Sequence, residues 1–280
     1  MNLPFTKMHG LGNDLVVVDL VSNHVELSVE QIRLMGDRHL GIGFDQLLLI
    51  EPPSDPGVDF DYRIYNCDGT EVEHCGNGAR CFATFVTEKG LTRNNPILVK
   101  TVNRVLSLEI KADGQVMVDM AQPEFRPEKI PFKAEKQAKT YCRDIQLNGV
   151  STSVTFCALS MGNPHAIIIV EDLDNTAVTE IGKALGAHPD FPEGVNVGFM
   201  QILGRNTIKL RVYERGAGET LACGTGACAA VVAGCLLGHL GDTVTVNLKG
   251  GTLQISWRQN AAPVLMTGPT TTVYEGIIRL

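Results

Sequence analysis

The chain has 280 residues, of which 44% are hydrophobic and 20% charged, and its formal net charge is −7. This composition is typical of a globular protein with a hydrophobic core, and the length allows one large domain or two ordinary ones. The negative charge and the absence of long Lys/Arg clusters argue against nucleic acid or an anionic membrane as the partner.

The first residues, MNLPFTKMHG, have no basic segment followed by an apolar core, so we expect no signal peptide. The longest apolar run, residues 227–237, is too short to span a bilayer. Eight cysteines in 280 residues do not make a disulfide scaffold, and their spacings do not predict a zinc site or a redox pair. We therefore expect a cytoplasmic protein with free thiols and no bound metal.

Short β-branched segments separated by turn residues predict strands along the whole chain. Their connections are short, which favours antiparallel pairing over crossovers through helices. The clearest of these segments cover residues 15–20, 105–110, 116–120, 153–159, 166–170, 208–213, 243–248 and 252–257.

Four helices are predicted. The sequence SVEQ at residues 28–31 is typical of a capping box and predicts a helix that ends before Gly41. A second helix is expected over residues 175–186. Two more follow cysteines, over residues 78–88 and 226–237. The last is apolar all round, which predicts a short helix wrapped by strands.

The most informative feature is a cysteine loop that occurs twice. Residues 63–79 read RIYNCDGTEVEHCGNGA and residues 211–227 read RVYERGAGETLACGTGA, with a constant offset of 211 − 63 = 148. Two Gly-Asn turns, at residues 12–13 and 162–163, recur with an offset of 150. The repeat predicts two related halves, residues 1–122 and 123–268. We expect residues 269–280 to return to the first half.

Cys75 and Cys223 occupy the equivalent position in the two loops, each just before a predicted helix. The positive end of a helix lowers the pKa of a thiol, and bare glycine N–H groups can hold a carboxylate. Two such thiols suit a reaction in which one removes a proton from a carbon and the other protonates the opposite face. The alternative is a repeated packing unit with inert thiols, which accounts less well for the glycines beside each cysteine.

The halves differ most where Glu214-Arg215 replaces Asn66-Cys67. An arginine can bind a carboxylate through two hydrogen bonds and a glutamate can pair with an ammonium, so this pair could recognise an amino-acid group. The alternative is a surface ion pair of little energetic value.

Several other polar residues are candidates for ligand contacts. Alone, each asparagine is typical of a turn, but as a set related by the repeat they indicate a polar ring around a small ligand. A histidine near a thiol can tune its pKa or be a hydrogen-bonded structural group. These candidates are Asn13, Asn66, Asn163, Asn196 and His165.

Taken together, these segments closely resemble the diaminopimelate epimerase family over nearly the whole chain. The resemblance is carried by MHGLGNDLVVVD (8–19), GFDQLL (43–48), YNCDGTEVEHCGNGARC (65–81), GNPHA (162–166), GVNVGF (194–199) and YERGAGETLACGTGA (213–227). It implies an α+β fold of two pseudo-symmetric domains, each a barrel-like, mostly antiparallel sheet around a central helix. It also implies an isomerase that interconverts LL- and meso-2,6-diaminopimelate without pyridoxal phosphate or another cofactor, in lysine and peptidoglycan precursor synthesis.

The resemblance also implies roles for individual residues. Cys75 and Cys223 match the two acid/base cysteines, and His165 and Glu214 match a pair that modulates their pKa values. Tyr274 matches a tyrosine associated with dimerisation, so a homodimer is expected. The positions that match substrate contacts are Asn13, Gln46, Asn66, Gly76, Asn77, Asn163, Asn196, Glu214, Arg215, Gly224 and Thr225.

Two other functions remain open at this point. A proline or hydroxyproline racemase-like isomerase would also use two cysteines on a duplicated design, but its substrate lacks a distal amino-acid group. A non-catalytic amino-acid-binding protein would keep the scaffold without exchanging the α-proton. A cysteine hydrolase fits poorly, because it needs one nucleophile with a histidine base rather than two equivalent thiols.

Overall fold

The computed structural model describes residues 2–72 and 76–280, and the chain divides into two compact units. The first unit consists of Met1–Asp119 and Thr267–Leu280, and the second of Met120–Met266. The last segment of the chain thus belongs to the first unit.

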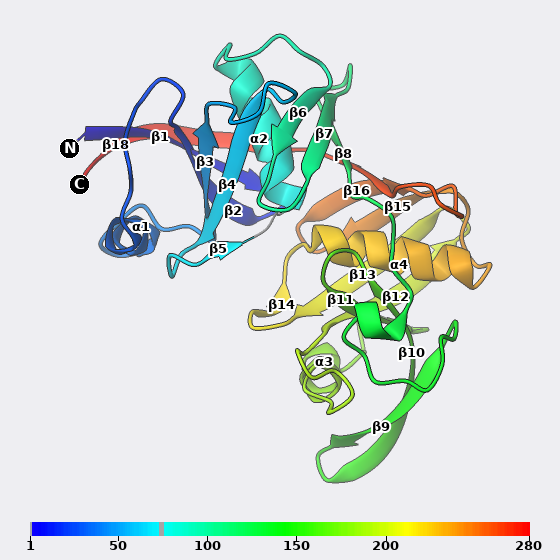
Figure 1. The fold of residues 1–280 in the computed structure, drawn as a ribbon. Coiled ribbons are helices and arrows are strands. Elements are labelled where there is room, and N and C mark those ends of the chain that lie inside the picture. The colour runs from blue at the N-terminus through cyan, green and yellow to red at the C-terminus, as the bar shows by residue number, and fades with distance from the viewer. Residues whose placement is uncertain (1, 73–75) are drawn as a thin grey trace. The chain divides into compact units, whose positions relative to one another are not determined.

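The first unit is a curved sheet in which the strands pair in the order β18–β1–β2–β3–β4–β6–β7–β8 (Figure 1). The short β5 pairs with β4 as a hairpin. β18 runs antiparallel along β1, and Lys89, the residue after α2, pairs with Glu275 of β18 at 2.6 Å. The elements are β1 (Asn2–Gly10), β2 (Asn13–Asp19), α1 (Val29–Gly36), β3 (Gln46–Glu51), β4 (Phe60–Asn66), β5 (Glu71–Val72), α2 (Gly76–Glu88), β6 (Ile97–Lys100), β7 (Val105–Ile110), β8 (Val116–Asp119) and β18 (Thr271–Arg279).

The second unit repeats this plan, with strands in the order β9–β10–β11–β12–β13–β15–β16 and β14 as the short hairpin on β13. β17 (Leu265–Gly268) lies where the chain passes back to the first unit. The other elements are η1 (Pro127–Lys129), β9 (Tyr141–Leu147), β10 (Val150–Ser160), β11 (Pro164–Ile169), α3 (Val178–Gly186), β12 (Asn196–Gly204), β13 (Thr207–Glu214), β14 (Gly218–Thr220), α4 (Gly224–Leu236), β15 (Thr243–Leu248) and β16 (Gly251–Ser256).

Most strand pairs are antiparallel, as the short connections favour, but each unit also contains helical crossovers between parallel strands. In each unit two pairs are parallel: β2–β3 and β4–β6 in the first, and β11–β12 and β13–β15 in the second. A parallel pair needs a long return connection, and the four connections contain α1, α2, α3 and α4 in chain order. The helices therefore belong to the connections between parallel strands.

Each unit is built around one central helix. α2 contacts strands from both ends of its sheet, β1, β2 and β3 on one side and β7 and β8 on the other, so the sheet curls around it. α4 contacts β10–β13 and β16 in the same way. The prediction of an apolar helix surrounded by protein is confirmed, since residues 227–233 of α4 are fully buried. The fold class of two pseudo-symmetric α+β domains is likewise confirmed.

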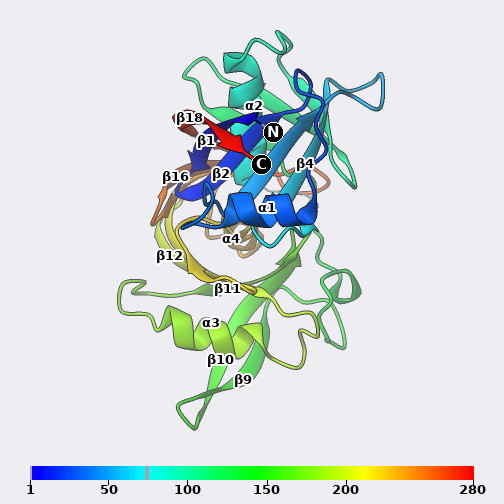
Figure 2. The same ribbon diagram turned by 90° about the vertical axis from the view of Figure 1, so that its left-hand side faces the viewer.

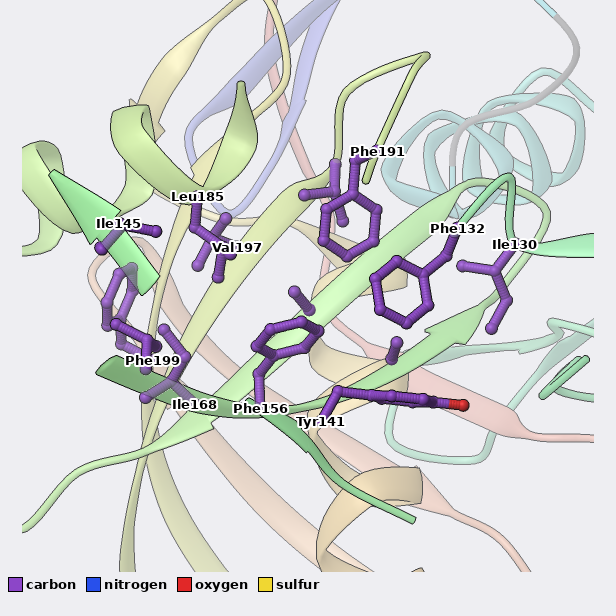
Figure 3. Close-up of a cluster of buried hydrophobic side chains, with 14 of the residues drawn as sticks. Ile130, Phe132, Tyr141, Ile145, Phe156, Ile168, Leu185, Phe191, Val197 and Phe199 are labelled. Carbon is purple, nitrogen blue, oxygen red and sulfur yellow. The ribbon is translucent and has the colours of Figure 1, made fainter. Parts of the chain in front are cut away.

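A smaller helix covers the outer face of each sheet (Figure 2). The capping box of α1 is confirmed: the Gln31 N–H donates to Ser28 Oγ at 3.3 Å, and the Ser28 N–H donates to Gln31 Oε1 at 2.9 Å. In the second unit, α3 packs on a cluster of aromatic and aliphatic side chains that includes Phe132 and Phe191, whose rings stack 4.6 Å apart (Figure 3). Strands between two helices are buried on both faces, which explains runs such as VVV and LLLI.

The helix bounds differ from the expected ones by a few residues. α2 and α4 begin two residues earlier than predicted, at Gly76 and Gly224. α3 begins at Val178 rather than near Asn175, because the side chain of Asp172 accepts hydrogen bonds from the next backbone N–H groups and holds a turn there. None of the helices in the described part of the chain has the length and apolar character needed to cross a membrane.

Candidate active site

The second cysteine loop is well defined. Cys223 is the N-cap residue of α4, with an extended backbone (φ −119°), and its side chain is buried. Its Sγ lies 3.6 Å from Thr225 Oγ1. The two predicted carboxylate anchors, Gly224 and Thr225, form the first turn of α4, where backbone N–H groups have no partner within the helix. This turn has the chemistry to hold an anion next to the thiol.

The first cysteine of the pair, Cys75, lies outside the described residues, as do Glu73 and His74. The helix that follows is described from Gly76. Gly76 and Asn77, the matching anchors, are both buried in the first turn of α2. The first turns of α2 and α4 thus carry the two predicted pairs of anchors.

The hairpin before each helix is held by the same ion pair. Arg63 Nε and Nη2 donate to the two carboxylate oxygens of Glu71 at 2.7 and 3.0 Å, and Arg211 does the same with Glu219 at 2.7 and 3.0 Å. In both cases the arginine lies on the long strand and the glutamate on the short one. The Arg and Glu that recur in the repeated sequence therefore fix the strands that lead into each cysteine.

The second glycine of each Cys-Gly-x-Gly motif has a packing role that the sequence analysis did not foresee. A Cβ on Gly78 would lie 2.7 Å from Tyr62 Oη, and a Cβ on Gly226 would lie 3.0 Å from Val212 and 3.2 Å from Cys223 Sγ. Each helix start is thus pressed against the strand before it. Packing therefore accounts for this glycine of each motif.

The expectation of an acidic thiol is wrong for Cys223. Burial raises the pKa of the Cys223 thiol well above its ordinary value, and the nearby Glu214 carboxylate raises this pKa further. The Thr225 hydroxyl and the Gly226 N–H act in the opposite sense but do not compensate. Loss of solvent therefore outweighs the helix N-terminus, and Cys223 is a neutral thiol in this structure.

The polar residues of the second unit form one connected group. His165 on β11 is paired in register with Asn196 on β12, and His165 Nε2 lies 3.0 Å from Asn163 Oδ1. The Asn196 side chain accepts from the Arg215 N–H at 2.9 Å and donates to the Pro164 carbonyl at 3.1 Å. The structure thus brings together four of the candidate residues of the second unit: Asn163, His165, Asn196 and Arg215.

His165 is completely buried, and its Nδ1 has no hydrogen-bond partner. Burial lowers the pKa of His165 to about 3, and the positive charge of Arg215 acts in the same direction. The imidazole is therefore neutral at physiological pH, with one ring nitrogen as a hydrogen-bond donor and the other as an acceptor. Glu214, at the end of β13, accepts a hydrogen bond from the Thr220 hydroxyl at 2.5 Å.

The matching group in the first unit consists of four amide side chains. Gln46 Nε2 donates to Asn66 Oδ1 at 3.4 Å, and these residues face each other across β3 and β4. Asn77 Nδ2 donates to Asn13 Oδ1, also at 3.4 Å. Gln46 Oε1 is buried without a hydrogen-bond partner. The structure therefore places Asn13 beside Asn77 and Gln46 beside Asn66, and their contacts with substrate stay a prediction.

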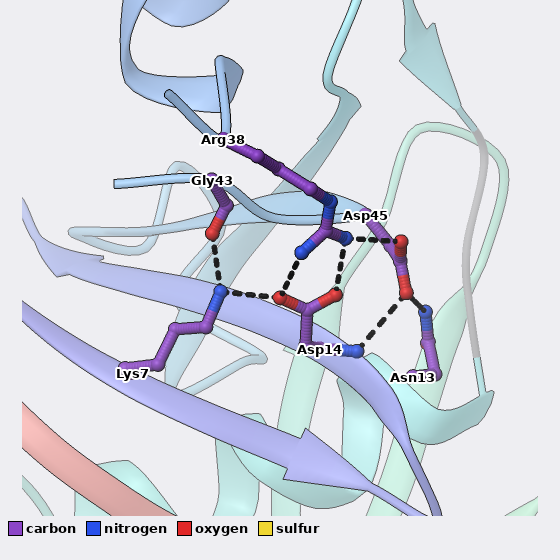
Figure 4. Close-up of polar contacts among 6 residues, drawn as sticks. All are labelled: Lys7, Asn13, Asp14, Arg38, Gly43 and Asp45. Carbon is purple, nitrogen blue, oxygen red and sulfur yellow. Dashed lines mark hydrogen bonds and ion pairs between the residues drawn. The ribbon is translucent and has the colours of Figure 1, made fainter. Parts of the chain in front are cut away.

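Asn13 is hydrogen-bonded to a network of charged side chains that was not predicted from the sequence (Figure 4). Asp14 pairs with Arg38 at 2.7 Å and with Lys7, whose ammonium also contacts the Gly43 carbonyl. Asp45 pairs with Arg38 at 2.8 Å and accepts from Asn13 Nδ2 at 3.2 Å. Burial alone would raise the pKa of Asp14, but hydrogen bonds from Arg38 and Lys7 lower this pKa. No spacing rule links these residues, because they come from separate segments.

The remaining candidate residue, Tyr274, contacts Phe5 of the first unit. Tyr274 lies on β18 with 46% of its surface exposed and its ring edge-on to Phe5, 5.9 Å between centroids. In the part of the chain that the structure describes, no three His, Cys, Asp or Glu side chains are grouped to hold a metal ion.

Each unit is therefore a barrel-like sheet around a helix whose first turn follows a cysteine, which defines a class of duplicated α+β proteins. A solved structure of a hydroxyproline epimerase from Agrobacterium vitis with bound trans-4-OH-L-proline shares this fold with a TM-score of 0.69. It is 15% identical and covers 99% of this chain and 92% of its own. At that identity the likeness concerns the fold alone.

Sequence comparison identifies the family. The model of the diaminopimelate epimerase family matches residues 5–126 and 157–273. The diaminopimelate epimerases of Pseudomonas syringae pv. tomato and Ectopseudomonas mendocina are each 53% identical over 280 residues, which covers the whole of both chains in each comparison. The chain belongs to the diaminopimelate epimerase family, and the resemblance drawn from its motifs is confirmed.

Proposed function

We propose that this protein is an isomerase that interconverts LL- and meso-2,6-diaminopimelate with two cysteine thiols and no cofactor. The observation that carries the proposal is the in-register repetition of the cysteine loop in a chain of the diaminopimelate epimerase family. The reaction serves lysine and peptidoglycan precursor synthesis. Its site residues, apart from Cys75, are supported by the grouping of the polar side chains described above.

In the proposed reaction one cysteine thiolate removes the α-proton of diaminopimelate, and the electron pair passes into the adjacent carboxylate. The thiol of the other cysteine then protonates the α-carbon from the opposite face, which inverts its configuration. Each turnover leaves the two cysteines in exchanged protonation states, so the reverse reaction starts from the product form. Electron density that collects on the carboxylate is stabilised by the N–H groups of the anchors Gly76, Asn77, Gly224 and Thr225.

The distal amino-acid group of the substrate explains the asymmetry between the halves. Arg215 can bind its carboxylate and Glu214 can pair with its ammonium, whereas the first unit has Asn66 and Cys67 at these positions. The Arg215 side chain donates to the Glu193 carbonyl at 2.7 Å, which directs the guanidinium. A cyclic imino acid has no group for this pair to bind.

We further propose that the protein is a cytoplasmic homodimer with Tyr274 at the contact. Val273, Tyr274 and Ile277 of β18 are 53%, 46% and 66% exposed, which is unusual for large apolar side chains on one strand. Sedimentation of the wild type and of Tyr274→Glu tests this: a dimer that the variant converts to monomer supports the contact, and a monomeric wild type contradicts it.

The function is tested with reduced protein and LL-diaminopimelate in deuterated water, without added cofactor, while the α-proton is followed by NMR. We expect the α-proton signal to disappear as the meso isomer forms. Exchange of trans-4-hydroxy-L-proline or proline instead would identify the racemase-like alternative, with Arg215→Ala harmless. Binding of diaminopimelate without any exchange would identify a non-catalytic binding protein.

A further inference from the structure

Arg80 on α2 is a buried cation that is not among the predicted site residues. Its side chain is completely inaccessible to solvent. The corresponding residue of the second half, 80 + 148 = 228, is Cys228 in the apolar helix α4. A charge is costly to bury unless hydrogen bonds replace its water, so the contacts of Arg80 indicate what it does.

The guanidinium is directed at the first turn of its own helix. Nη2 donates to Asn77 Oδ1 at 2.9 Å, and Nη1 donates to the Gly76 carbonyl at 3.3 Å. Nε donates to the Pro269 carbonyl at 3.4 Å, in the segment that returns to the first unit. Gly76 and Asn77 are the predicted anchors of the reacting carboxylate, so Arg80 holds that turn from inside.

A chain of hydrogen bonds runs from Arg80 to the surface. Asn77 Nδ2 donates to Asn13 Oδ1 at 3.4 Å, Asn13 Nδ2 donates to Asp45 Oδ2 at 3.2 Å, and Arg38 Nη2 donates to Asp45 Oδ1 at 2.8 Å. The two charged ends give this chain its direction. An arginine can only donate and a carboxylate can only accept, so both amides between them have one favoured orientation.

The space around the chain is shaped for it. Gly10 precedes the turn that carries Asn13, and a Cβ at Gly10 would lie 3.1 Å from both Arg80 Nη2 and Asn77 Cβ. Only a glycine lets strand β1 approach the guanidinium this closely without a shift. The glycine in the MHG segment thus belongs to the same arrangement.

We propose that Arg80 is a positioning residue that orients the Asn77 and Asn13 amides, and the Gly76–Asn77 turn, toward diaminopimelate through this hydrogen-bond chain. This role rests on the proposed function. It gives the first unit a buried cation next to its carboxylate anchor, where the second unit has Cys228 at the matching position. Arg80 does not touch substrate.

The test compares Arg80→Lys, Arg80→Met and Asp45→Asn with the wild type in steady-state epimerisation of LL-diaminopimelate, with the thermal midpoint measured alongside. Lysine keeps the charge but not the planar set of donors, so it should not restore function. We expect each variant to raise KM about tenfold or more, the effect of losing one oriented hydrogen bond, with a smaller effect on kcat. Cys228→Ala, at the matched position, should change neither.

The double variant Arg80→Lys/Asp45→Asn tests whether the hydrogen-bond chain acts as a unit. Arg80→Lys and Asp45→Asn also keep the proposal testable if Arg80→Met does not fold. If the two ends act through the same amides, the double variant should be no worse than the poorer single variant. Effects on kcat/KM that multiply would overturn the chain. Folded variants with KM within twofold of wild type, whatever their thermal midpoint, would overturn the positioning role. The wild type in the same assay tests the proposed function separately. A wild type that does not epimerise LL-diaminopimelate would contradict the proposed function, whatever the variants do.

Discussion

The two cysteine loops share one scaffold but have opposite electrostatic surroundings. The same Arg–Glu pair fixes both hairpins, and the same glycine packs both helix starts against a strand. Behind the first loop lies the buried Arg80, whereas Glu214 lies beside the second and raises the pKa of Cys223. The groups that fix the backbone, the Arg–Glu pair among them, are thus the same in both halves, whereas the charged groups next to the helix starts differ. An asymmetric substrate with one reacting and one distal amino-acid group is matched by such a site.

The largest expected effect concerns the thiols themselves. Cys75→Ala and Cys223→Ala should each lower the rate of epimerisation about 10²–10⁴-fold, because each removes one acid/base group. Inversion is followed by chiral analysis of the product, with the exposed Cys142→Ser as the control that should leave the rate unchanged. Full inversion by either single variant would refute the two-thiol comparison.

A second prediction compares Leu15 with His165, which occupy matching positions opposite Gln46 and Asn196. The folded pKa of His165 is about 3 and its ordinary value is 6.5, so the unfolded chain binds the extra proton first. Above pH 6.5 the imidazole is mainly neutral in both states, so its protonation has little effect on the unfolding free energy. As the pH falls from 6.5 toward 3, the unfolded chain is protonated but the folded protein is not, and the unfolding free energy decreases. Between pH 6.5 and 4.5 the unfolding free energy of His165→Leu should therefore decrease by about 2–3 kcal/mol less than that of the wild type.

Urea unfolding at a series of pH values measures this difference. The exposed His239→Gln is the control and should keep the pH dependence of the wild type. An equally steep loss of stability in His165→Leu would mean that His165 does not remain neutral in the folded state.

A third prediction concerns the repeated ion pair. The side chains of Arg211 and Glu219 are 20% and 16% exposed, against 42% and 34% for Arg63 and Glu71, and Lys249 also contacts Glu219 at 2.6 Å. Glu219→Gln should therefore cost about 1–2 kcal/mol of unfolding free energy and Glu71→Gln about 0.5–1 kcal/mol. Chemical denaturation of the two variants measures both. Equal costs would show that burial does not distinguish the two hairpins.

The smallest expected effect tests the charge beside Cys223. Glu214→Gln removes a negative charge and so lowers the pKa of the Cys223 thiol, which leaves more thiolate at a given pH. Alkylation of Cys223 by iodoacetamide at pH 8, followed by mass spectrometry of its peptide, should become about three- to tenfold faster. The exposed Glu180→Gln serves as control. An unchanged rate would assign the raised pKa to burial alone.

Local patterns in the sequence predicted much of the fold. The capping box of α1, the apolar character of α4 and the main strands are set by neighbouring residues, and the structure has them within a few positions. The parallel pairs were missed because the connection between two parallel strands includes a whole helix and its loops. Short turns between consecutive segments do not reveal such pairs.

The sequence by itself determined the duplication, the two cysteine positions and the family, because these depend on residue identity and spacing. Only the tertiary structure decided that Cys223 is a weak acid and His165 a neutral base, because both follow from loss of solvent inside a folded unit. The Arg80 chain likewise joins residues 13, 45, 77 and 80 from one strand, one helix and a loop. Hydrogen bonds and burial depend on three-dimensional proximity, and folding alone brings these groups together.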